Sequence, residues 1–194
     1  MPVVTRLREV PRNRVAVEID GNPWRVLPAD VVVRAGLATG LALDRPTLRL
    51  LRRELRRAEA LDVAARALRG RDLSREALAL RLERAAVPPA AAEESLATLG
   101  RAGLVDDARV ARSRARGLAE RGYGDEAIRE RLRAEGLEEH TATAVAELTP
   151  EAERAQTLIT RRGQGPRTAR YLAGRGFGED AVEAALGAAF GQDG

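Results

Sequence analysis

Apolar and polar residues alternate with a period of two near the start of the chain, and the spacing then changes to a helical one. Residues 15–19 alternate strictly, the turn formed by residues 20–23 follows, and a second apolar run occupies residues 24–27. Alternation on both sides of such a turn predicts a β-hairpin, to which residues 3–10 can add a third strand. An isolated hairpin is marginally stable, so we expect it to pack on the helices that follow.

The pattern after the hairpin indicates one short helix and then a long helical region. We expect the short helix over residues 30–35, ended by Gly36, and a loop over residues 37–43. Asp44 and Pro46 are suited to open the long helix, because proline is tolerated in a first helical turn. This second helix carries a row of arginines between residues 49 and 57.

An apolar pattern then recurs through the rest of the chain. It appears three times, with offsets of 50 and then 40 residues, at Leu78, Leu82 and Val87, at Ile128, Leu132 and Leu137, and at Thr168, Leu172 and Phe177. A helical segment precedes each copy, at residues 61–68, 108–121 and 152–162, and another follows it, at residues 90–99, 141–148 and 179–190. Such recurrence predicts three tandem three-helix units, which must stack to bury enough surface.

The middle copy, residues 106–137, has the clearest pattern. Asp107 is placed to cap its first helix, and the apolar residues from Val110 to Ala119 fall on one face. Arg109, Arg112 and Arg116 fall on the opposite face. Glycines at 122 and 124 predict the end of this helix, and a second helix opens at Asp125.

This stretch resembles the middle of the RecX family, the regulators that bind the RecA recombinase filament. The order of the shared features is Asp106-Asp107, Val110-Ala111, a basic helix from Arg112 to Arg121, Gly122-Tyr123-Gly124, Ile128, Leu132 and Gly136-Leu137. RecX proteins usually have an aromatic residue where this chain has Val110. The hairpin, short helix and glycine-containing loop upstream are also typical of RecX, so the resemblance covers nearly the whole chain.

The repeats and the resemblance together give the expected fold. It is mainly α, with three tandem three-helix repeats in an elongated curved array, preceded by a small N-terminal β-hairpin and short helix. The expected parts are residues 1–43 for the N-terminal extension, 44–105 for the basic helix and first repeat, 106–149 for the second repeat and 150–194 for the third. The resemblance implies a regulator that lies along the RecA filament, bridges its protomers and inhibits strand exchange and ATP hydrolysis in recombination and DNA repair.

Charge narrows the possible partners. All 33 cationic residues are arginine and the net charge is only +4, so the total charge is not that of a strongly basic nucleic-acid-binding protein. A GC-rich genome accounts for arginine in place of lysine, yet each guanidinium can still bind phosphate or carboxylate with two parallel hydrogen bonds. Residues 1–57 hold twelve arginines against six acids, a net charge of +6.

Several side chains are candidates for partner contact. They are Arg53, Arg57, Leu80, Arg81, Arg84, Arg109, Arg112, Arg116, Arg121, Arg129 and Arg133. Leu80 is included because it falls opposite Leu78 and Leu82, on the side of Arg84. The alternative interpretation is a solvated helix face with internal pairs such as Arg116–Glu120.

The chain offers little that is typical of an enzyme. We expect the single histidine, His140, to be a surface residue rather than a metal ligand. We expect the pair Asp106-Asp107 to cap a helix rather than to act as a catalytic carboxylate pair. A P-loop requires a lysine, which the sequence lacks, and no nucleophile–base arrangement stands out. We therefore expect no catalytic residue, no cofactor and no metal.

Location and assembly follow from similar reasoning. The sequence has no cysteine, no apolar run near the roughly 20 residues that span a bilayer and no apolar leader, so we expect a cytoplasmic protein with no membrane partner. We expect a monomer that contacts the RecA filament and that binds DNA either directly or through the filament. The alternative function is that of a helix-turn-helix-like DNA-binding transcriptional regulator, with an arginine-rich helix in the major groove.

Overall fold

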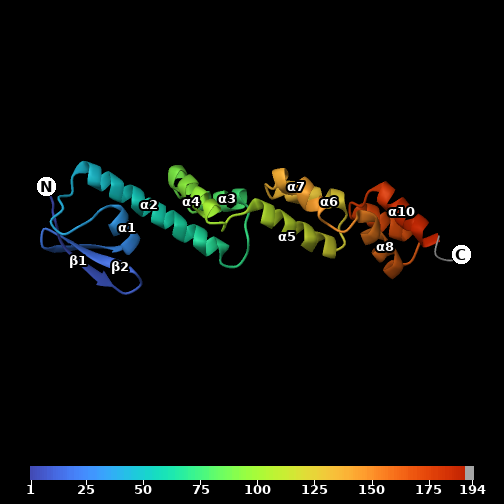
Figure 1. Cartoon of the computed structure of the whole chain (residues 1–194), viewed down its shortest axis with the longest axis horizontal. Helices are drawn as coiled ribbons and strands as arrows, with labels where there is room; N and C mark the ends of the chain where they lie inside the picture. Colours follow the sequence, from blue (N-terminus) through green and yellow to red (C-terminus); the bar gives the residue numbers. More distant parts are fainter. Residues whose placement is uncertain (191–194) are drawn as a thin grey trace. The chain divides into compact units, whose positions relative to one another are not determined.

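The computed structural model is mainly helical and describes residues 1–190. In this range the chain forms three strands followed by ten helices, so the predicted mainly α fold with a small N-terminal β element is confirmed (Figure 1). Its contacts divide it into two compact units, one made of residues 1–71 and 78–101 and the other of residues 72–77 and those from 102 onward. The elongated, curved form of the array stays a prediction.

The N-terminal strands form one antiparallel sheet with the order β1-β2-β3. The strands are β1 (Val4–Val10), β2 (Arg14–Ile19) and β3 (Asn22–Pro28). The predicted hairpin is confirmed, with Val15 opposite Leu27. The third strand is present as well, and β1 pairs with β2 along its length.

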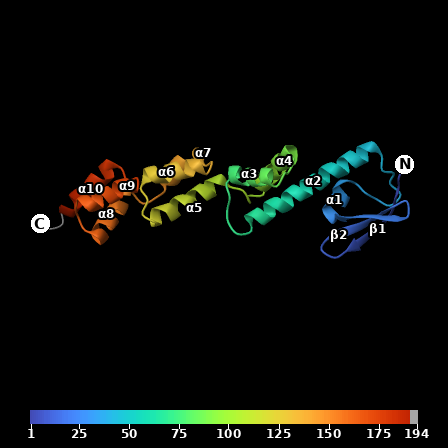
Figure 2. The same cartoon turned by 180° about the vertical axis from the view of Figure 1, so that it is seen from behind.

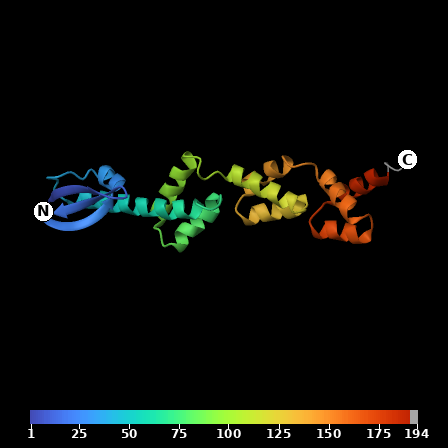
Figure 3. The same cartoon turned by 90° about the horizontal axis from the view of Figure 1, so that it is seen from below.

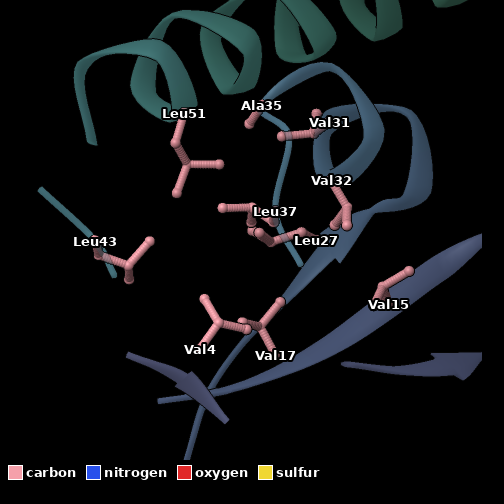
Figure 4. Packing of buried hydrophobic residues seen from close by; sticks show 10 residues of the cluster. All are labelled: Val4, Val15, Val17, Leu27, Val31, Val32, Ala35, Leu37, Leu43 and Leu51. Atoms are coloured by element: carbon pink, nitrogen blue, oxygen red, sulfur yellow. The ribbon is translucent and has the colours of Figure 1, made fainter. Parts of the chain in front are cut away.

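The sheet packs against helices, as expected for strands that are marginal alone. The short helix α1 (Ala29–Arg34) follows β3 directly. Figure 4 shows the core that results, in which Val4, Val17 and Leu27 of the sheet lie close to Val31 of α1 and Leu51 of the next helix. All five of these side chains are at most 2% exposed.

The long helix α2 (Arg45–Leu68) is continuous, so the predicted long helix and the predicted segment at residues 61–68 belong to one helix. No glycine or proline interrupts the chain between Pro46 and the end of α2. Asp44 caps the helix as predicted, accepting a hydrogen bond from Thr47 N–H at 2.8 Å. One helix therefore carries both the arginine row and the first helical segment of the first repeat.

The remaining helices follow in the predicted order. They are α3 (Arg75–Arg84), α4 (Pro89–Arg101), α5 (Asp107–Glu120), α6 (Asp125–Ala134), α7 (Glu138–Ala146), α8 (Glu151–Arg162), α9 (Pro166–Gly174) and α10 (Glu179–Phe190). Figure 2 shows α8, α9 and α10 as one group, and Figure 3 shows α5 to α7, in yellow-green to orange, as another. Within the described residues, no helix is both long enough and apolar enough to cross a bilayer.

The three middle helices α3, α6 and α9 end with the same backbone geometry. In each copy the N–H two residues past the C-cap donates to a carbonyl five residues earlier: Val87 to Leu82 at 3.0 Å, Leu137 to Leu132 at 3.0 Å, and Phe177 to Leu172 at 3.1 Å. The residue just before each donor has a positive φ, at Ala86, Gly136 and Gly176. This recurring turn is a Schellman motif, and its spacing confirms the repeat offsets of 50 and 40 residues.

Candidate partner-binding surfaces

Helix α5 begins at Asp107, but its cap is the preceding residue. Asp106 accepts a hydrogen bond from Arg109 N–H at 2.9 Å, so the prediction that Asp107 is the cap was off by one residue. This hydrogen bond lowers the pKa of the Asp106 carboxyl below its ordinary value. Asp107 instead accepts from the backbone N–H of Arg75 at 2.7 Å and so joins α5 to the start of α3.

The two faces of α5 separate as the spacing predicted. Its apolar face is buried, with Val110, Ala111, Ala115 and Leu118 in the core of the helices α5 to α7. On the other face, Arg109, Arg112 and Arg116 line a shallow hollow of about 450 Å³ together with Ser113, Gly117 and Glu120. The structure thus brings these three predicted arginines together on one accessible surface, which we call the α5 face.

The three arginines of the α5 face differ in how strongly other groups hold them. Arg109 donates to the Gly103 carbonyl at 3.0 Å and pairs with Asp72 at 3.3 Å. Arg112 reaches Glu147 only at 4.0 Å, the limit of an ion pair. Arg116 makes no ion pair with any described residue, so the alternative pairing with Glu120 is not formed.

Two other predicted arginines, both on α6, already form ion pairs with acidic residues of the same unit. Arg129 pairs with Asp125 and Glu126, each at 3.6 Å. Arg133 lies 3.3 Å from Glu138 and 3.9 Å from Glu126. These side chains match the interpretation of a solvated helix face whose charges pair internally.

The remaining candidate contact residues of the repeats are less restrained by neighbouring side chains than the two arginines of α6. Leu80 is 45% exposed, while Leu78 and Leu82 of the same helix are fully buried, as the spacing predicted. Arg81 and Arg84 beside it, and Arg121 at the end of α5, form no ion pair with any residue in the described range. They are therefore free to reach a partner.

On α2, Arg57 and Arg53 differ in how far their side chains are exposed. Arg57 is only 9% exposed, and its guanidinium lies 3.3 Å from Glu94 of α4 and 3.7 Å from Glu54. Arg53 also reaches Glu94, at 3.4 Å, but its side chain is largely exposed. Arg57 thus joins two helices within the first unit rather than offering a surface to a partner.

The joined helices α2 and α4 enclose a groove that the sequence did not show. The groove has a volume of about 370 Å³ and is lined by Arg49, Arg52, Arg53, Arg56, Pro88, Ala90, Ala91 and Glu94. The arginine row on α2 was evident from the sequence, but its opposite wall comes from residues about 40 positions later. Only a contact between distant segments could reveal it, and we call it the α2/α4 groove.

Sequence reasoning also missed a stack of arginine and tyrosine side chains in the second unit. The Arg131 and Arg175 guanidinium carbons lie 4.1 and 4.6 Å from the centre of the Tyr123 ring. Arg175 and Arg162 lie 5.3 and 3.8 Å from the centre of the Tyr171 ring. Of these arginines, Arg175 alone contacts a ring of each repeat, so its cation–π contacts link the second repeat to the third.

Beside this stack, the first turn of α6 packs against the Gly176 turn at the end of α9. The N–H groups of Gly124 and Glu126 donate to the carbonyls of Arg175 and Gly176 at 2.8 and 3.2 Å. Arg154 of α8 pairs with Asp125 and donates to the Tyr123 carbonyl at 2.8 Å. Backbone hydrogen bonds and a half-buried ion pair therefore fix how these two repeats meet.

Comparison with known proteins adds a strong structural match. No protein-family profile matches the chain, and no curated protein matches it. The crystal structure of a regulatory protein RecX superposes with a TM-score of 0.82 and 22% identity, covering 94% of this chain and 98% of that one. RecX from Lactobacillus salivarius superposes with a TM-score of 0.61 and 18% identity, covering 68% of this chain and 94% of that one. The chain therefore has the fold of these RecX proteins.

Proposed function

We propose that the protein is a RecX-type regulator that binds the RecA filament and inhibits its ATP hydrolysis and strand exchange. The observation that carries this proposal is the match to a regulatory protein RecX over nearly the full length of both chains. The resemblance of residues 106–137 to the RecX motif order supports it independently, because it rests on the sequence alone.

The surfaces of the chain suit a regulator better than an enzyme. Exposed arginines lie on several helices, and the hollows that they line are shallow and open. The α5 face offers Arg112 and Arg116, whose guanidinium groups can bind either carboxylates of a protein or phosphates of DNA within the filament. We propose this face as one contact with the filament.

The test uses the purified protein and preformed RecA filaments on single-stranded DNA. We expect the protein to co-sediment with the filaments and to lower their rate of ATP hydrolysis as its concentration rises. Absence of both effects at protein concentrations equal to that of RecA would overturn the proposal.

A parallel titration with naked duplex DNA tests the helix-turn-helix alternative. Binding through phosphates alone weakens steeply as salt rises, because each contact releases counterions from the DNA. Tight binding to a defined duplex sequence, without any effect on RecA filaments, would favour the transcriptional regulator.

A further inference from the structure

We infer that the α2/α4 groove binds an acidic, leucine-containing segment of the partner protein. The inference rests on the proposed function and deepens it, because it names the chemistry of the partner segment and the surface that receives it. The groove belongs wholly to the first unit, whereas the α5 face belongs to the second.

The walls of the groove are held in place by an ion pair whose arginine is buried. Arg57 lies between α2 and α4, 3.3 Å from Glu94, and only 9% of its surface is exposed. Arg53 approaches the same carboxylate at 3.4 Å. Glu94 is the only acid in the groove lining, and two guanidinium groups already neutralise it.

Three further arginines of the lining have exposed side chains that can reach an anion. Arg49, Arg52 and Arg56 are exposed and form no ion pair with any residue in the described part of the chain. Their spacing on a helix places them along one edge over about 10 Å. A row of this length matches several successive acidic side chains rather than one isolated anion.

The opposite side of the groove is apolar. Pro88 directly precedes α4, and Ala90 and Ala91 lie in its first turn, so these small apolar side chains lie at the positive end of a helix dipole. A leucine between acidic residues can rest on this surface while its neighbours reach the arginines.

The same lining disfavours single-stranded nucleic acid as the occupant. Proteins that bind single strands pair a basic groove with aromatic side chains on which the bases stack. None of the eight residues that line this groove is aromatic. Charge and shape together therefore favour an acidic peptide with an aliphatic anchor.

The test begins with a peptide titration of the full-length protein, followed by fluorescence anisotropy. The probe is a fluorescein-labelled peptide of alternating glutamate and leucine; one comparison peptide has serine for each leucine, and another probe is an oligothymidylate of equal length.

The groove variants are Arg52→Glu/Arg56→Glu and, on the apolar side, Ala90→Glu. The control is Arg69→Glu/Arg71→Glu, which reverses two exposed arginines of the same unit outside the groove. Thermal melting verifies that each variant is folded.

We expect each groove variant to bind the glutamate–leucine peptide about tenfold or more weakly, because it replaces attraction or apolar contact with repulsion. The control should stay within about twofold of the unmodified protein, and the serine peptide and the oligothymidylate should bind more weakly than the leucine peptide. Equal binding by groove variants and control, no binding of the peptide, or tighter binding of the oligothymidylate would each overturn the inference.

The filament assay separates this inference from the proposed function. If the unmodified protein inhibits RecA and the groove variants inhibit it equally, the groove inference fails and the proposed function stands. If the unmodified protein has no effect on filaments, the proposed function fails and the groove loses its proposed partner, whatever the peptide titration shows. Loss of both peptide binding and inhibition in the groove variants alone supports both.

Discussion

Gly124 lies so close to Gly176 that a β-carbon on Gly124 would come within 2.2 Å of the Gly176 carbonyl oxygen. The contact is between two backbones, so no flexible side chain can move aside. The φ of Gly124 is −80°, a value that any residue can adopt. Gly124 is therefore required by the close approach of the third repeat and not by the conformation of its own turn.

This contact predicts that Gly124→Ala separates the second and third repeats. We expect a loss of about 1–3 kcal/mol in the free energy of unfolding, typical of forcing extra atoms into a packed site. Urea unfolding measures it. Gly117→Ala is the matched control, because Gly117 lies inside α5 with nothing within 4 Å of its added carbon. That change should stabilise the protein by about 0.5–1 kcal/mol, and destabilisation of the same size in both variants would contradict the prediction.

A second prediction concerns the core of the second repeat. Leu132 of α6 is fully buried, in contact with the apolar face of α5 and with α7. Leu132→Ala should cost about 2–5 kcal/mol in urea unfolding, because it removes buried contacts and leaves a cavity. Leu104→Ala removes the same atoms from a side chain that is 56% exposed, and it should change stability by less than about 0.5 kcal/mol. Similar losses in the two variants would mean that burial of Leu132 does not determine its contribution.

The third prediction tests the α5 face. Arg112→Glu/Arg116→Glu should weaken inhibition of RecA-driven ATP hydrolysis and leave the melting temperature nearly unchanged. Arg116 makes no ion pair with any described residue, and the contact of Arg112 with Glu147 is 4.0 Å long, so little intramolecular attraction is lost. Solvent-side substitutions of this kind rarely change stability by more than about 0.5 kcal/mol.

The control for that experiment is Arg161→Glu/Arg167→Glu, which makes the same change of charge in the third repeat. Both of these arginines are exposed, so they report the effect of net charge alone. Inhibition that is unchanged in the α5 variant, or equally reduced in both variants, would exclude the α5 face from the contact and leave the α2 arginines as the candidate.

The fourth prediction concerns pH. The Arg109 N–H lowers the pKa of Asp106 in the folded protein. A lowered pKa stabilises the fold above the ordinary aspartate value, and this stabilisation is lost as pH falls through the lowered pKa. Asp106→Asn keeps the capping oxygen but not the charge, so the stability difference from the unmodified protein should shrink between about pH 5 and about pH 2. Urea unfolding across this range measures it, and a constant difference would be the contrary result.

Local pattern predicted most of the fold, because each repeat is a short unit with its own apolar spacing. The positions Leu82, Leu132 and Leu172 predicted the three middle helices, and all three are fully buried. The repeat pattern did not show that the arginine row and residues 61–68 belong to one helix, α2, although no glycine or proline lies between them. Repetition shows which segments are equivalent, but it does not show where one helix stops.

The candidate surfaces were less predictable, since they depend on which charges meet across the sequence. Arg109 pairs with Asp72, which lies 37 residues earlier, and Arg57 pairs with Glu94, which lies 37 residues later. Helical spacing places an arginine on a face but does not show whether a distant carboxylate already holds it. The same limit hid the second wall of the α2/α4 groove.

The contact between repeats also has a consequence for self-association. A head-to-tail contact can continue from one copy of a chain to the next and produce filaments. Here the equivalent positions in the first and third repeats differ: Ala86 stands where Gly176 accepts the N–H of Glu126, and Pro166 stands where Glu126 donates it. A methyl group at the first position and a missing N–H donor at the second make the same contact between copies of the chain unfavourable. We therefore expect these two substitutions to disfavour polymerisation of the protein through this contact.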